Sequence, residues 1–136
     1  KQILMDYQRL PKIENEHEEQ KALIQWFRLQ YPRYAKCLWA IPNGGGRHIR
    51  TAVKLKDEGV LAGVSDLFLM VPINNYHGMF IEMKTRKGKP QKNQKDFLML
   101  AQSMGYSANI CYGFEQGKAF INSYLQSRKG FDKIEK

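Results

Sequence analysis

Residues 65–84 read SDLFLMVPINNYHGMFIEMK, and they predict two β-strands joined by a turn. The runs 65–71 and 79–84 are rich in apolar and aromatic residues, over lengths typical of buried strands. Between them, residues 74–78 (NNYHG) are of the types that favour a turn. We therefore expect the two strands to run antiparallel as neighbours in one sheet.

Three charged side chains are expected on one face of these strands. Because side chains alternate along a strand, Glu82 and Lys84 share a face. A turn centred near Asn75 would place Asp66 opposite Lys84 and diagonal to Glu82. Cross-strand neighbours lie about 5 Å apart directly and about 7–8 Å diagonally. One Mg²⁺ ion can bridge two carboxylates over that gap, since Mg–O distances are about 2.1 Å.

Burying charge on apolar strands is costly unless the charge is paired or binds an ion. An ion pair at the end of the sheet would account for any one of Asp66, Glu82 and Lys84. The set of three, at this spacing, favours a metal site.

The remaining pattern predicts helices and strands that alternate along the chain. The expected elements are a helix over 15–31, a strand over 36–41, a loop over 42–46, a short helix over 51–58, the two strands above, a helix over 91–104, a strand over 106–112 and a helix over 114–125. Strands separated by helices indicate an α/β fold, a three-layer α/β/α sandwich with a central mixed sheet. We expect a single domain over residues 1–136, with a core of about 15–126 and a basic tail over 127–136.

The composition favours a nucleic-acid partner and argues against a membrane protein. The net charge of +9 and the pI of about 9.6 attract polyanions, although a basic surface also serves solubility. No apolar run approaches the roughly 20 residues that cross a bilayer, and no secretory signal is visible. The two cysteines form neither a disulfide framework nor a zinc motif. We expect a cytoplasmic, reducing environment.

Polar residues in the first turns of two predicted helices are further candidates for the site. Gln94 precedes Phe97 and Leu98 by three and four residues, so it lies on the apolar stripe of its helix. Glu16 precedes Leu23 by seven residues, so it also lies on the apolar stripe of its helix. Glu19 is close to the same stripe and is the alternative to Glu16 as the carboxylate at the site. Each of them is also typical of a helix start, where the dipole favours a carboxylate or amide.

Two basic segments are candidates for phosphate contacts. The first follows Lys84 directly and is predicted to form a rim beside the metal site, although a solvated charge run is the alternative for some of its members. The second surrounds a glycine-rich loop at 43–47, whose backbone amides could approach phosphate, unless the loop is only a connection. The predicted nucleic-acid-binding residues are Asn43, Arg47, Arg50, Lys54, Arg86, Lys87, Lys89 and Lys92.

These motifs resemble the PD-(D/E)XK nucleases, in which an Asp at a strand end is followed by Glu-x-Lys on the next strand. Here they are Ser65-Asp66 and Glu82-Met83-Lys84, with Ser65 in place of the usual Pro. The resemblance narrows to the VRR-NUC (virus-type replication-repair nuclease) domain and runs from about residue 16 to 125. Its landmarks are the stretches 16–20 (EHEEQ), 41–45 (IPNGG), 63–67 (GVSDL), 81–84 (IEMK), Gln94 and 105–106 (GY).

The resemblance implies a restriction-endonuclease-like core and a set of catalytic roles. Asp66 and Glu82 would hold Mg²⁺, with Mn²⁺ possible, helped by the Met83 carbonyl and by Glu16 directly or through water. Lys84 would orient or deprotonate the attacking water. Gln94 would steady that water or Lys84.

The resemblance also implies a hydrolase, a structure-selective DNA endonuclease similar to Holliday-junction resolvases, acting in DNA repair as a homodimer on branched DNA. A viral or bacterial origin is expected. The alternatives are a sequence-specific or nonspecific nuclease on the same scaffold, a nucleic-acid-binding module whose charged cluster is structural, and a basic interaction protein. A pure binding module has no need of three charges on one strand face, which argues against it.

Overall fold

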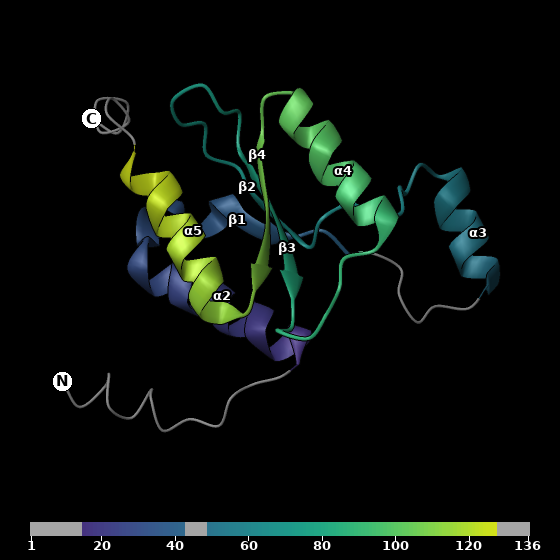
Figure 1. The fold of residues 1–136 in the computed structure, drawn as a ribbon, viewed down its shortest axis with the longest axis horizontal. Coiled ribbons are helices and arrows are strands. Elements are labelled where there is room, and N and C mark those ends of the chain that lie inside the picture. Colours follow the sequence, from purple (N-terminus) through teal and green to yellow (C-terminus); the bar gives the residue numbers. More distant parts are fainter. Residues whose placement is uncertain (1–14, 43–48, 128–136) are drawn as a thin grey trace.

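The computed structural model describes residues 15–42 and 49–127, with the side chains of 49–51 excluded. The elements are α2 (Glu16–Gln30), a 3-10 helix η1 (Pro32–Cys37), β1 (Leu38–Ala40), α3 (Ile49–Asp57), β2 (Leu67–Leu69), β3 (Met79–Lys84), α4 (Lys92–Ser103), β4 (Ser107–Tyr112) and α5 (Phe114–Gln126) (Figure 1). No helix in these two ranges is long and apolar enough to cross a membrane. The loop predicted over 42–46 lies, except for Pro42, outside the described residues.

The four strands form one mixed sheet in the order β1-β2-β3-β4. β1 and β3 each run antiparallel to β2, whereas β3 and β4 are parallel and are connected through α4. Parallel strands need such a crossover, because a tight turn reverses the chain direction and can join only antiparallel strands. β3 lies inside the sheet, so the strand that carries Glu82 and Lys84 is paired on both sides.

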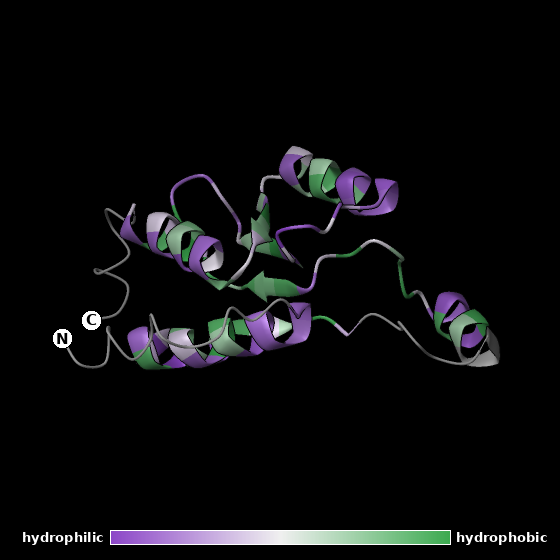
Figure 2. Cartoon of the chain, turned by 60° about the horizontal axis from the view of Figure 1, so that its bottom comes forward, coloured by the Kyte–Doolittle hydropathy of each residue, from purple (hydrophilic) through white to green (hydrophobic). Residues whose placement is uncertain are grey.

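Helices cover both faces of the sheet, which confirms the predicted α/β sandwich. Odd-numbered residues of β3, such as Ile81 and Met83, face α2 and α5 and join one apolar cluster with Leu23 and Phe27. Phe80, an even-numbered residue, faces α4 and joins a second cluster. Figure 2 shows the apolar strands in green between α4 above and α2 below. The same alternation puts the even-numbered Glu82 and Lys84 on the α4 face.

Helix α2 begins and ends where the sequence predicts, and the chain after it differs. The Asn15 side chain caps α2 by accepting a hydrogen bond from the His17 N–H at 2.8 Å. After Tyr31, Pro32 starts η1, since a proline is tolerated in the first turn of a helix. The strand expected over 36–41 is therefore shorter and spans Leu38–Ala40, with single backbone hydrogen bonds continuing the pairing at Cys37 and Ile41.

The hairpin register differs from the expected one by two residues. Leu67 pairs with Ile81, and this register, continued by one residue, places Asp66 opposite Glu82 rather than opposite Lys84. The side chains of Asp66 and Glu82 still share the α4 face, because a shift of two residues preserves the alternation.

The turn explains the shifted register. It is centred between Asn74 and Asn75, and Asn74 has a φ of 54°. Ile73 and Tyr76 pair across it. Four steps along the chain separate Leu69 from Ile73, but three separate Tyr76 from Met79, so the first arm holds one extra residue, as in a β-bulge. β2 is three residues long instead of the predicted seven.

Candidate active site

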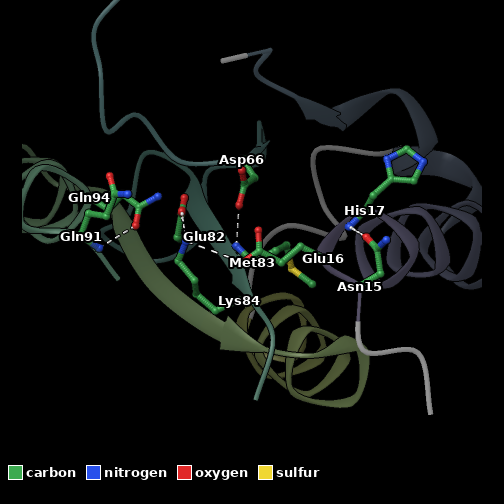
Figure 3. A network of polar contacts seen from close by, with 9 residues as sticks. All are labelled: Asn15, Glu16, His17, Asp66, Glu82, Met83, Lys84, Gln91 and Gln94. Atoms are coloured by element: carbon green, nitrogen blue, oxygen red, sulfur yellow. Dashed lines mark hydrogen bonds and ion pairs between the residues drawn. The ribbon is translucent and has the colours of Figure 1, made fainter. Parts of the chain in front are cut away.

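Asp66 and Glu82 lie side by side at the end of the hairpin, where β2 begins and β3 approaches its end. The Met83 N–H donates a hydrogen bond to Asp66 Oδ2 at 2.7 Å, which fixes this carboxylate against β3 (Figure 3). Within a strand the N–H and C=O of one residue point to the same neighbour. The Met83 carbonyl is therefore directed toward the same side as the Asp66 carboxylate.

The Glu82 carboxylate is almost fully buried, and one of its two oxygens lies near a positively charged group. Its side chain is 2% exposed, and Oε1 lies 3.5 Å from Lys84 Nζ. Oε2 is buried and has no hydrogen-bond partner among the described residues. The pKa of Glu82 is raised to about 7: burial is the largest cause, the charge of Asp66 adds to the rise, and Lys84 opposes it.

The pKa of the Asp66 carboxyl is raised as well. Burial raises its pKa above the usual value, while the hydrogen bond from the Met83 N–H opposes the rise. Glu16 raises this pKa as well, and Lys84 lowers it. The two carboxyls thus share a site in which a second negative charge is costly unless a cation offsets it.

Lys84 connects the strand to the first turn of α2. Its Nζ lies 3.8 Å from Glu16 Oε1 as well as near Glu82. The Lys84 side chain is 11% exposed and the Glu16 side chain 47% exposed. Glu16 therefore stands at the mouth of the cluster, where water and substrate can reach it.

The structure separates the two rival glutamates. Glu19 Oε2 accepts a hydrogen bond from the Phe114 N–H at the start of α5. Gly113, the N-cap residue of α5, has no side chain to cap the helix, so Glu19 takes that role from another helix. This contact went unpredicted, and its one sequence signal is the missing Ser, Thr, Asp or Asn before Phe114.

Gln94 lies in the first turn of α4, as expected, and its side-chain oxygen has a local partner. Oε1 accepts a hydrogen bond from the Gln91 N–H at 2.8 Å, and the two residues form a capping box. The Gln94 side-chain oxygen therefore has the helix-capping role that the sequence offered as the alternative to a catalytic one. The contact leaves the Gln94 amide nitrogen for any role toward water or Lys84.

The donor set fits a hard divalent cation. Mg²⁺ is usually bound through one or two carboxylates, with water and phosphate oxygens completing the shell. Asp66, Glu82 and the Met83 carbonyl offer such oxygens, and a cation would supply the partner that Glu82 Oε2 lacks among the described residues. Within 15–42 and 49–127, no three His, Cys, Asp or Glu side chains gather closely enough to hold a metal by themselves.

The predicted phosphate-contacting residues are only partly described. Arg86, Lys87 and Lys89 are exposed in the loop between β3 and α4, and Lys54 is exposed on α3, which stands apart from the sheet (Figure 1). Lys92 is exposed and lies 2.7 Å from Asp96, so a phosphate would compete with that carboxylate. The predicted contacts of Asn43, Arg47 and the Arg50 side chain lie outside the described residues.

Comparisons with known proteins agree with this architecture. A family model described as the VRR-NUC domain matches residues 7–115. A solved structure described as a VRR_NUC domain protein superposes with a TM-score of 0.76 at 24% identity, over 88% of this chain and 93% of that one. A comparison with curated proteins found no match. The structural likeness shows that the fold is shared.

Proposed function

The chain belongs to the VRR-NUC domain family and is a nuclease of the PD-(D/E)XK type, and we propose that it is a metal-dependent, structure-selective DNA endonuclease. One observation carries the proposed metal dependence: among the residues that the structure describes, the buried Glu82 carboxylate keeps one oxygen without a hydrogen-bond partner, beside Asp66 and Lys84. A merely structural ion pair would satisfy that oxygen, since an unpaired buried acceptor costs about 1–3 kcal/mol.

The cation would be held by Asp66, Glu82 and the Met83 carbonyl, with Glu16 reaching it directly or through water. Mg²⁺ fits these oxygen donors, and Mn²⁺ accepts the same ligands. When bound, such a cation offsets the negative charge that develops on the phosphate and polarises its water.

The chain's own residues position the attacking water. Lys84 Nζ lies near both Glu82 and Glu16. In its ammonium form it would orient that water, and only as a neutral amine would it take the water's proton. Glu16 holds the ammonium group at the mouth of the cluster. The Gln94 amide nitrogen steadies the water or Lys84 while its oxygen caps α4.

Branched DNA is the proposed substrate, and a homodimer the proposed active form. The net charge of +9 supports a polyanionic partner, and the exposed cations of the loop after β3 follow Lys84 within five residues of the chain. A homodimer would present two sites to two strands, as resolution of a four-way junction requires. The resemblance to junction-resolving nucleases supports this form of the proposal.

Cleavage of labelled substrates tests the proposal. We would incubate the protein with a four-way junction, a flap and a plain duplex, each with Mg²⁺, Mn²⁺ or EDTA. Asp66→Ala is the inactive variant, and Glu115→Ala, which removes an exposed carboxylate of α5, is the matched control. We expect metal-dependent cutting of the branched substrates that is lost only in Asp66→Ala. Binding without cutting under every condition would instead favour a nucleic-acid-binding module.

A further inference from the structure

Trp39 is an exposed aromatic side chain next to the carboxylates. Its residue is 42% exposed, in β1 at one edge of the sheet. We propose that the Trp39 indole is a stacking platform for an unpaired base of the DNA beside the phosphate that is cut. The proposal rests on the nuclease function above and narrows its substrate to DNA with an unstacked nucleotide near the cleavage point.

The strand register places Trp39 on the catalytic face. Trp39 pairs with Phe68, and Phe68 with Phe80, so these aromatic side chains form one row across the sheet on the face that carries Glu82. The next row, two residues along the strands, holds Ile41, Asp66 and Glu82. Trp39 is therefore a diagonal neighbour of Asp66, at a separation of about 7–8 Å.

The indole is supported from behind rather than loosely exposed. The Trp39 and Phe68 rings meet edge to face with centroids 5.3 Å apart, and the Phe68 and Phe80 centroids are 4.6 Å apart. Phe80 in turn packs on Phe97 of α4 at 5.0 Å. Such pairs stabilise a fixed ring orientation. A preordered ring loses little conformational entropy when a base binds it.

The helix above this face stops short of Trp39. The apolar cluster under α4 takes its sheet residues from β3 and β4, and it includes neither Trp39 nor Phe68. The aromatic row is therefore covered at its inner end by α4 and exposed at its outer end, where β1 lies. A ligand that approaches the carboxylates across β1 meets the indole first.

A nucleotide chain matches both rows at once. Its phosphate needs the cation site and the basic loop, and its base offers a flat surface that stacks on any aromatic ring. A base within a duplex is already covered on both faces by its neighbours. Only a base in a single strand, a bulge, a flap or a junction crossover can therefore stack on Trp39, and this provides selectivity for structure rather than sequence.

Tryptophan fluorescence tests the contact without catalysis. The chain has two tryptophans, and the other, Trp26, packs on Phe27 and Tyr31 of the opposite layer. In a Trp26→Phe variant the emission reports Trp39 alone. With EDTA present, we expect a short single strand to quench this emission and a blunt duplex of the same sequence to leave it nearly unchanged.

Binding of the full chain supplies the second readout. Trp39→Ala should weaken binding to a bulged duplex about tenfold, the scale on which base stacking contributes. Trp39→Phe, which keeps a ring, should weaken it less than about threefold, and affinity for plain duplex should stay the same. Leu29→Ala removes an exposed apolar side chain of α2 and should change neither affinity.

The outcomes separate this proposal from the nuclease function. No quenching, or an equal loss of affinity for bulged and plain duplex in Trp39→Ala, overturns the stacking proposal while metal-dependent cleavage can persist. If the protein shows quenching and selective binding but cleaves no substrate, the result supports the stacking platform and refutes the proposed metal-dependent cleavage of branched DNA. A change of oligomeric state in Trp39→Ala, with unaltered DNA affinity, assigns Trp39 to self-association and overturns the proposal.

Discussion

Replacing Glu82 by glutamine should stabilise the metal-free protein at alkaline pH while it abolishes activity. The side chain is 2% exposed, and its pKa lies at about 7 in the folded protein against 4.5 for the ordinary group. A rise of this size corresponds to about 3 kcal/mol against the ionised form. Glutamine has the shape of the protonated acid and does not ionise, so the variant avoids this cost.

The direction in which pH changes the free energy of unfolding follows from proton binding. Between pH 4.5 and about 7 the folded protein keeps the Glu82 proton that the unfolded chain has lost. The free energy of unfolding of the wild type therefore falls as pH rises through this window. The variant and the wild type should be about equally stable at pH 4.5, and the variant should be more stable by about 3 kcal/mol at pH 8.

Urea unfolding in EDTA at several pH values measures the difference. With a slope of ~1–3 kcal/mol per molar for a small protein, the midpoint of Glu82→Gln should exceed that of the wild type by at least about 1 M at pH 8. Glu115→Gln, at an exposed carboxylate, should show no such pH-dependent gain. Mg²⁺ should stabilise the wild type but not Glu82→Gln. Equal midpoints at pH 8 would refute the reasoning that the buried, ionised Glu82 destabilises the metal-free protein and that a bound cation offsets this cost.

Three further predictions concern the neighbours of this carboxylate and the turn before β4. Asp66→Ala and Lys84→Ala should both abolish cleavage with unchanged circular dichroism, and only Lys84→Ala should keep the stabilisation by Mg²⁺; retained cleavage in both would contradict the site. Glu19→Ala should lower stability by about 1 kcal/mol, the usual effect of losing a helix cap, seen as a lower melting temperature. Glu19 also fixes the first turn of α2, which carries Glu16. The Glu19→Ala substitution should therefore slow cleavage when Glu16 is present and have no further effect in a Glu16→Ala background; additive losses of rate would disprove that coupling. Gly105→Ala should cost roughly 1–2 kcal/mol in urea unfolding, because Gly105 has a φ of +91° and a Cβ there would lie 2.7 Å from the His77 ring; an unchanged midpoint would show that the turn relaxes.

The sequence determined the local features, because they depend on neighbours along the chain. Alternation alone put Glu82 and Lys84 on one face, and β3 spans the predicted 79–84. The positions of the helices follow from their apolar spacing and from breakers such as Gly105. The Asp, Glu and Lys of the motif are short-range patterns as well, and so the family could be inferred from them.

Tertiary structure alone decided how distant segments meet. One extra residue before the turn sets the register that brings Asp66 opposite Glu82, and no composition rule fixes which residue is extra. The choice between Glu16 and Glu19 depends on where α5 begins beside α2, which is a contact across 95 residues. Trp39 joins the catalytic face only through the pairing of β1 with β2. Such contacts are set by the packing of the whole sheet and its helices, and no pattern within one segment records them.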